Sequence, residues 1–375
     1  MKNKLAIALF VLPLLSSCCL QKELTVNYIK DGNILQEKIP TGQYIVNDSS
    51  IRTPYTASFL FYKQDSISFE NGNSDRLIIH KTPIKLDFSK RIKRNSAEYY
   101  TIATAYYTDK VLSYYSDLFK GKLTFNEAEY SNIDVVFGDM GLLSTPKRYV
   151  FEKGQPLSPS IFYHEVGHRA FWMIEDSLRI KFKGLSYIHV GLMEYFTVSL
   201  HNSPLIGEGV LLGKLMRNAS LAYSYPHHDS LCIGNSVLLL KETYSKQLQD
   251  STLSITKYYK LLEKEITGDI GKIVDNHKGS MLITSMLWRI RQQIGQANAD
   301  KLVVASTLAL NDAIRQRNVF YKAAPNETMK DRVQWYDLLW SLLQKDKELY
   351  GGANQQLIVN EFKQTSYPVE KVAIP

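Results

Sequence analysis

One short stretch of the sequence carries residue types that could bind a metal ion and use it. His164 and His168 flank Glu165 in the sequence His-Glu-Val-Gly-His. Side chains four residues apart lie on one face of a helix, so both imidazoles could offer a nitrogen to one tetrahedral Zn²⁺. Glu165 would lie beside the metal, where its carboxylate could accept a proton from the attacking water and pass it to a leaving amine. The stretch therefore predicts hydrolysis assisted by one zinc ion.

A catalytic zinc site needs a third protein ligand. The pattern with a third His six residues after the second is excluded, because that position is Ile174. Glu194 is the best candidate, since its position 26 residues after His168 leaves room for a loop and a returning helix. Glu175 and Asp176 compete with it, but they continue the same helix or its end and would face away or lie too far along. Three ligands would leave the fourth position for water.

The flanking sequence favours a buried catalytic helix over a helix with two surface histidines. Ser158 is a favoured N-cap and Pro159 a favoured first helical residue, which predicts a helix over residues 159–176. Apolar side chains should surround the His pair on this helix, namely those of Ile161, Phe162, Phe171 and Trp172.

The elements before this helix are predicted to be mostly strands. Short β-branched and aromatic runs alternate with turn signals between residues 23 and 91, which indicates a small antiparallel β domain. Residues 96–119 hold no Gly or Pro and place apolar residues at helical spacing, so they predict a long amphipathic helix whose aromatic stripe serves packing. Two further strands are expected at residues 133–137 and 148–151.

Helical patterns dominate after Leu192. The clearest cover residues 280–293, 299–308 and 332–343. The chain is long enough for two packed lobes, and its composition is that of an ordinary folded protein.

The two motifs together resemble those of the gluzincin peptidases, and within them the thermolysin-like group. The resemblance rests on His-Glu-Val-Gly-His at 164–168 and on the Gly-Leu-Met-Glu-Tyr-Phe segment that holds Glu194. It extends over residues 96–362 in the order of helix, strands and zinc helix. It implies an α+β fold in which a β-rich N-terminal domain (18–95) precedes a thermolysin-like zincin lobe (96–200) and a mainly helical C-terminal lobe (201–375).

The resemblance also implies a further catalytic residue. Residues 274–280 resemble the family segment in which a His precedes a Gly and a buried helix, so His277 would donate a hydrogen bond to the oxyanion. For a second oxyanion donor, often a Tyr, the candidate is Tyr187. The family's Asn-Ala pair for substrate backbone is missing from the turn at 144–147, and its carboxylate four residues after the metal Glu is here Val198.

The N-terminus predicts export and a lipid anchor. Residues 1–17 combine a basic start with an apolar stretch too short to span a membrane, as in a secretory signal. The sequence Leu-Ser-Ser-Cys ending at Cys18 resembles the lipobox of bacterial lipoproteins, in which the Cys is acylated. Cys19 follows where Asp would retain the protein in the inner membrane, so outer-membrane sorting is favoured. A plain signal peptide with incidental cysteines is the alternative.

The net charge and the remaining cysteine limit which partners and disulfide bonds are expected. The net charge of +8 falls to +6 once Lys2 and Lys4 leave with the signal, and the surplus is interpreted as spread along the chain. With no recognised module beside that charge, nucleic-acid binding is not expected. Cys232 is left without an internal disulfide partner and is expected to be a buried small hydrophobe.

Two functions follow from these patterns. The first is a membrane-anchored zinc peptidase that hydrolyses peptide or protein substrates, with Glu165 as base and acid. The second is a zincin-fold lipoprotein that binds or assembles and cleaves nothing. Glu165 argues for the first, because a metal held only for structure does not need that carboxylate.

Overall fold

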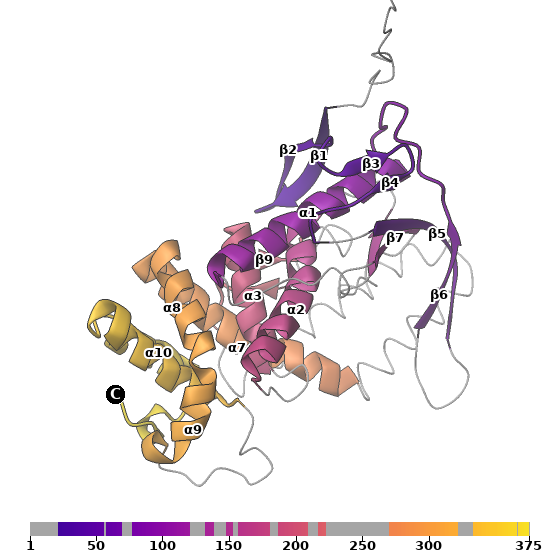
Figure 1. The fold of residues 1–375 in the computed structure, drawn as a ribbon. Helices are drawn as coiled ribbons and strands as arrows, with labels where there is room; N and C mark the ends of the chain where they lie inside the picture. The colour runs from indigo at the N-terminus through magenta and orange to yellow at the C-terminus, as the bar shows by residue number, and fades with distance from the viewer. Residues whose placement is uncertain are drawn as a thin grey trace, which may run out of the picture.

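The fold combines helices and strands, as the α+β class predicts (Figure 1). The computed structural model describes residues 22–55, 58–69, 77–120, 132–138, 148–152, 157–180, 187–208, 217–222, 270–321, 333–365 and 367–374. The buried apolar residues of one cluster run from Leu24 in the first strand to Val372 near the C-terminus. Most of the described elements therefore pack around one continuous core.

The chain begins with two hairpins. Strands β1 (Glu23–Lys30) and β2 (Asn33–Pro40) pair antiparallel around Asp31 and Gly32, whose φ values of 53° and 74° suit a tight hairpin turn. The predicted turn at this position is confirmed. Strands β3 (Ile45–Asn47) and β4 (Ser50–Ile51) form a second, shorter hairpin.

A four-stranded sheet with the order β6-β5-β7-β8 follows. Strand β5 (Ser58–Phe69) pairs antiparallel with β6 (Leu77–Pro83) and parallel with β7 (Asn132–Gly138), which pairs parallel with β8 (Arg148–Glu152). The strands predicted near 133–137 and 148–151 are confirmed. The sheet is mixed, and it joins strands from both sides of the helix that lies between them in the sequence.

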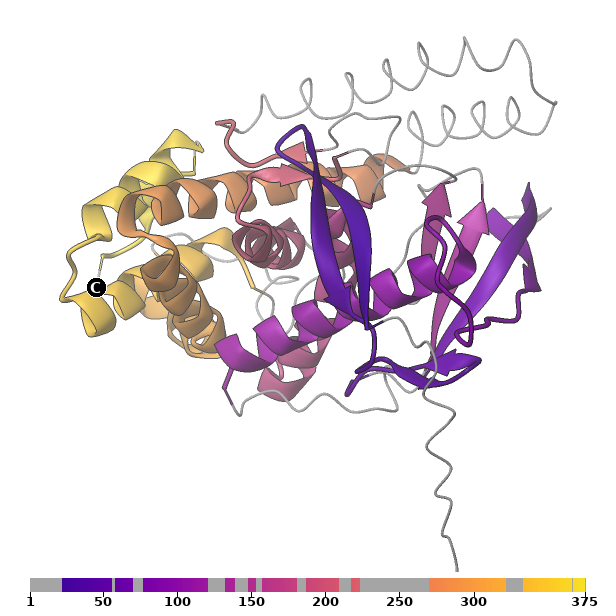
Figure 2. The ribbon, with the colours of Figure 1, turned by 90° about the horizontal axis from the view of Figure 1, so that it is seen from above.

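That helix is α1 (Ala97–Leu118), which begins at an N-cap where the Ser96 hydroxyl accepts from the backbone N–H of Tyr99 at 3.2 Å. Its aromatic residues pack inward, and the Tyr107 ring stacks on Phe162 with centroids 5.0 Å apart. The predicted helix and its packing role are confirmed. Figure 2 shows the β1–β2 hairpin crossing α1, where the Tyr99 hydroxyl accepts from the N–H of Asn27 at 3.0 Å.

Three helices build the centre of the molecule. They are α2 (Pro159–Leu178), α3 (Tyr187–His201) and α7 (Ile270–Ile294). A Cβ atom at Gly191 would lie 2.5 Å from the Ile283 Cβ and 2.9 Å from the Ser280 carbonyl, so α3 and α7 touch through a glycine. After α3 come the two-residue strands β9 (Leu205–Ile206) and β10 (Arg217–Asn218), which pair antiparallel.

The rest of the described chain is helical. It comprises α8 (Gln296–Leu308), α9 (Leu310–Phe320), α10 (Trp335–Tyr350), α11 (Gln355–Gln364) and the short η3 (Val369–Lys371). The predicted helices are confirmed, although α7 begins ten residues before residue 280. No helix in the described part of the chain has the length and apolar run that a membrane crossing requires.

Candidate metal centre

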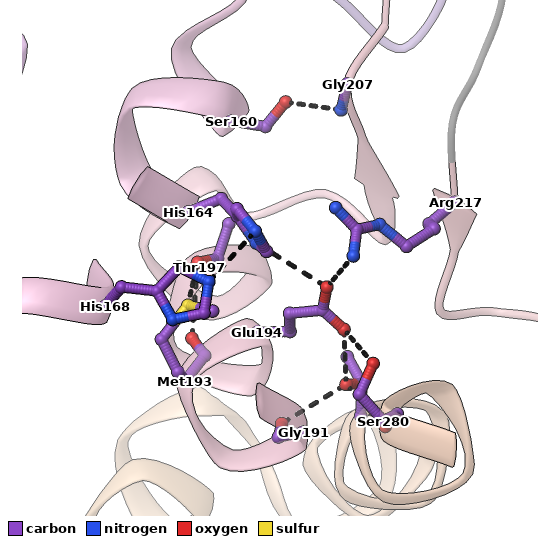
Figure 3. A network of polar contacts seen from close by, with 11 residues as sticks. Ser160, His164, His168, Gly191, Met193, Glu194, Thr197, Gly207, Arg217 and Ser280 are labelled. Carbon is purple, nitrogen blue, oxygen red and sulfur yellow. Dashed lines mark hydrogen bonds and ion pairs between the residues drawn. The ribbon is translucent and has the colours of Figure 1, made fainter. Parts of the chain in front are cut away.

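Helix α2 places His164 and His168 one turn apart on the same buried face. The two residues are 3% and 5% exposed, and their Nε2 atoms lie 3.3 Å apart (Figure 3). Two nitrogens at zinc-bond length from one tetrahedral ion are separated by about 3.3–3.4 Å. The imidazole pair therefore fits two positions of a tetrahedral zinc site.

Helix α3 brings Glu194 to the same place. This carboxylate is fully buried, and its Oε1 lies 3.5 Å from Nδ1 of His164. Its Oε2 accepts hydrogen bonds from Ser280 at 2.8 Å and Thr284 at 3.3 Å, both from α7. The third candidate ligand thus reaches the His pair from a neighbouring helix, as the spacing in the sequence suggested.

The three side chains do not aim their ligand atoms at a single point. His168 meets the Nε2 edge of the His164 ring, whereas Glu194 meets the Nδ1 edge. Within the described residues, no group of three or more His, Cys, Asp and Glu side chains has the geometry to hold a metal ion. A zinc ion bound by all three would require Glu194 or the His164 ring to turn.

Arg217 explains how Glu194 is held in this orientation. Its guanidinium Nη1 donates to Oε1 of Glu194, and the Arg217 side chain is only 10% exposed. Burial raises the pKa of Glu194, while the charge of Arg217 and the hydrogen bonds from Ser280 and Thr284 act in the opposite direction. The guanidinium is therefore hydrogen-bonded to the same oxygen of Glu194 that faces His164.

Glu165 lies next to His164 on α2 and is half-buried. Desolvation raises the pKa of its carboxyl to about 8, and the positive charge of Arg217 opposes this shift. A carboxyl that titrates near neutral pH can both accept and return a proton. Its position and protonation therefore suit the acid and base role predicted for it.

A second layer of contacts surrounds His168. The ring of His189, from α3, lies parallel to it at 5.7 Å and 16°, and Nδ1 of His189 is bound to the Glu175 carboxylate. The Trp172 ring covers another side at 5.9 Å, yet Trp172 is 40% exposed. Glu175 was expected to face away from the site or to lie too far along the helix to be a ligand; its carboxylate binds His189, so it reaches the surroundings of His168 only through that ring.

Other predicted residues fall elsewhere. Val198 is buried and apolar, and Asp176 is exposed. The backbone of His277 lies within α7, whereas it was expected ahead of a helix, and its side chain is outside the described residues. Tyr187 is the first residue of α3, with its side chain likewise outside the description. Cys18, Cys232 and the turn at 144–147 lie outside the described residues altogether.

Sequence reasoning missed Arg217 and His189. Arg217 belongs to a two-residue strand, and its neighbour in the pairing is Ile206, so no periodic pattern marks it. His189 stands among apolar residues five positions before Glu194, so the sequence places it on the same helix. Nothing in the sequence links it to Glu175.

Comparison of the chain with models of protein families and with characterised proteins finds no match.

Proposed function

We propose that this chain is a zinc-dependent peptidase attached to a bacterial membrane by a lipid on Cys18. The observation that carries the proposal is the 3.3 Å contact between Nε2 of His164 and Nε2 of His168 beside two buried or half-buried carboxylates. His164, His168 and Glu194 would hold one zinc ion. A bound zinc ion would polarise the scissile carbonyl and make water a stronger nucleophile.

The protein's own groups would do the remaining work. Glu165, one residue from a metal ligand, would accept the proton of the attacking water and return it to the leaving amine. Burial raises the pKa of the Glu165 carboxyl to about 8, and the charge of Arg217 opposes this rise. The carboxyl can therefore be protonated or ionised near neutral pH. His277 would donate to the oxyanion, a role that comes from the resemblance to the gluzincins. The substrate class is a peptide or protein of unspecified sequence.

A non-catalytic module with this fold is the second candidate function. The ion pair between Arg217 and Glu194 favours it, because a guanidinium holds the carboxylate that zinc would need. The apolar Val198, where thermolysin-like enzymes have a carboxylate, points the same way. The half-buried Glu165 beside the His pair argues against it, since binding alone does not need this group.

The lipid on Cys18 would fix the protein to the cell envelope. Several acyl chains on one cysteine make attachment durable, whereas a single chain would be reversible. Cys19 at the following position favours the outer membrane.

The test compares the wild-type protein with Glu165→Gln, using Glu370→Gln, an exposed carboxylate near the C-terminus, as the control. Zinc content is measured by elemental analysis, and turnover is measured on a broad peptide library. Wild type and both variants should bind one zinc ion each. Turnover should fall by about 10²–10⁴-fold in Glu165→Gln only.

Two outcomes would decide against the peptidase. One is a wild-type protein that holds zinc and cleaves nothing in the library. The other is equal cleavage by wild type and Glu165→Gln, which would remove the proposed base from the reaction.

A further inference from the structure

A run of basic residues lies between β6 and α1, so the interpretation of an evenly spread surplus charge is wrong for this segment. Residues 84–96 contain five basic residues and one acidic residue, Asp87. All five basic side chains are exposed: Lys85, Lys90, Arg91, Lys93 and Arg94. We call these five side chains the basic surface.

The segment that carries the basic surface is firmly attached to the molecule. Leu86, Phe88 and Ile92 are buried at 5%, 1% and 7% exposure, so apolar side chains point inward between the basic ones. The N–H of Phe88 donates to the carbonyl of Asp48 at 2.8 Å. The basic side chains are therefore exposed on a backbone segment that its buried apolar neighbours hold in place.

Two acidic groups partly offset this charge, namely Asp87 and Glu98, whose carboxylate accepts from the backbone N–H of Asp87 at 2.9 Å. Asp87 lies 2.6 Å from the Nζ of Lys90 and also accepts from the N–H of Ser89 at 3.1 Å. These contacts lower the pKa of Asp87 to about 2, so it stays ionised beside Lys90. The other basic side chains keep a strong local excess of positive charge.

The basic surface lies close to the start of the described chain. The carbonyl of Lys22 accepts from the N–H of Thr41 at 3.1 Å, and the carbonyl of Thr41 accepts from Ile45 at 3.2 Å. Ile45 begins β3, which is followed by Asp48, the residue bonded to Phe88. Lys22 lies four positions after Cys18, and such a length of chain spans at most about 14 Å.

The elements are arranged so that this region lies at one end of the molecule. Figure 1 shows β3 and β4 beside the N-terminal end of α1, and the helices α8, α9 and α10 beyond the other end of α1. A membrane that holds a lipid on Cys18 would therefore lie near the basic surface and away from the C-terminal helices.

We propose that the basic surface binds the anionic phospholipid headgroups of the membrane into which the lipid on Cys18 is inserted. This inference rests on the proposed lipid anchor and not on the proposed peptidase activity. Basic clusters next to a membrane anchor are attracted to anionic lipids over about one Debye length. The anchor also keeps the surface at a high effective concentration of lipid, which an acidic protein in solution would not match.

The test uses the full lipidated chain reconstituted into vesicles of phosphatidylcholine alone or of phosphatidylcholine with phosphatidylglycerol. Exposed lysines are acylated with a water-soluble reagent and measured by mass spectrometry. Labelling of Lys85, Lys90 and Lys93 should fall about fivefold in the anionic vesicles and recover at high salt. Labelling of Lys301, exposed on α8, should be the same in both.

Two sets of charge-reversal substitutions test whether the basic surface causes this protection. In each, the labelling of Lys85 is compared between the two vesicle types. One changes four members of the basic surface to Glu and should make Lys85 labelling equal in the two vesicle types. The matched control changes four exposed lysines of the C-terminal helical region to Glu and should keep Lys85 protected. The first set is Lys90, Arg91, Lys93 and Arg94, and the control set is Lys301, Lys347, Lys363 and Lys371.

The same samples separate the possible failures. An N-terminal peptide without acyl mass would overturn the anchor and with it this inference, while leaving zinc-dependent cleavage open to its own test. An acylated wild-type chain whose Lys85 is labelled equally in neutral and anionic vesicles would overturn only the proposed binding of the basic surface to anionic headgroups, and the lipid anchor would stand.

Discussion

The electrostatics of the candidate centre depend on Arg217, a residue that belongs to neither sequence motif. Glu194 is fully buried, and Arg217 is the positive group bonded to its Oε1. A buried carboxylate is tolerated only when charge and hydrogen bonds compensate its loss of water. Arg217 does this in the structure, and a zinc ion would do it when bound by Glu194. The two cations are therefore expected to compete for one oxygen.

This competition gives a prediction for Arg217→Gln. Removing one member of a buried pair costs about 3–5 kcal/mol, so the metal-free variant should lose that much unfolding free energy. Zinc should then stabilise the variant more than it stabilises wild type, because a ligand of the native state adds its binding free energy. Chemical denaturation with zinc and with a chelator measures both effects.

The control is Arg289→Gln. Arg289 lies 2.6 Å from the buried Glu361 in a pair remote from the His residues, so this variant should be destabilised and show no extra response to zinc. An equal zinc response in both variants would contradict the competition.

A second residue-scale prediction concerns Glu175. Its carboxylate holds His189, whose ring lies parallel to that of His168. Groups that orient a metal-bound imidazole commonly contribute 10–100-fold to metal affinity, and a stacked ring should act at the lower end, about tenfold. Glu175→Gln should therefore weaken zinc binding and alter the visible spectrum of the Co²⁺ form. Asp176→Asn, at the exposed neighbouring position, should change neither the zinc affinity nor the Co²⁺ spectrum. Unchanged zinc affinity in Glu175→Gln would show that Glu175 and His189 do not support the metal site.

At the scale of elements, the candidate centre depends on how closely α2, α3 and α7 approach. A Cβ at Gly167 would lie 3.1 Å from the Met193 sulfur and 3.3 Å from the Tyr115 hydroxyl, so α2 also meets its neighbours through a glycine. The contact between α3 and α7 at Gly191 is closer still and involves the backbone of Ser280. The same approach lets the Ser280 hydroxyl reach Glu194.

Gly191→Ala should therefore damage both stability and the centre. The added methyl group would meet the Ser280 carbonyl at 2.9 Å, and overpacking of this kind costs about 1–3 kcal/mol. Separation of α3 and α7 should also weaken zinc binding, which a chelator titration measures. Gly42→Ala is the matched control, since a Cβ there meets nothing within 4 Å. A Gly191→Ala protein as stable as Gly42→Ala would show that the helices adjust without cost.

Local signals predicted most individual elements of the fold. The start of α2 follows from the preference of Pro159 for the first helical turn, since the Ser158 side chain makes no cap hydrogen bond. The long helix after Ser96 and the strands near 133 and 148 follow from capping and periodicity, which are properties of neighbouring residues. The pairing of β5 with β7 could not be predicted in this way, because alternation identifies a strand but not its partner. Arg217 and the pair of Glu175 with His189 were missed for the same reason: each depends on contacts between distant segments.

At the scale of the whole molecule, the first hairpin is tied to the end of α3. The backbone N–H groups of Asp31 and Gly32 donate to the carboxylate of Glu208 at 2.9 and 2.7 Å, and the hydroxyl of Ser203 donates to Asp31 at 2.5 Å. His201 lies within this junction and is 5% exposed. The N-terminal strands and the metal-bearing helices are therefore joined at a place that contains a buried titratable group.

Burial at this junction gives the last prediction, which concerns stability at low pH. Desolvation lowers the pKa of His201 to about 4 from its ordinary value of 6.5, with Lys30 and Lys110 adding to the shift and Asp31 opposing it. The unfolded chain binds a proton more readily than the folded one, so His201 contributes full stability above the unfolded pKa and loses it as the pH falls towards the folded pKa. The loss should reach at most about 3 kcal/mol between about pH 7 and about pH 4.

Urea unfolding of wild type and His201→Phe across this range isolates the effect, because other titrating groups contribute equally to both proteins. The Phe ring preserves the edge-on contact with Tyr163, whose centroid lies 5.8 Å from that of His201. Wild type should lose stability on acidification relative to His201→Phe, whereas exposed His80→Phe should follow wild type. Parallel pH curves for wild type and His201→Phe would mean that His201 takes up its proton as readily in the folded protein as in the unfolded chain, and that the junction between the hairpin and α3 admits water.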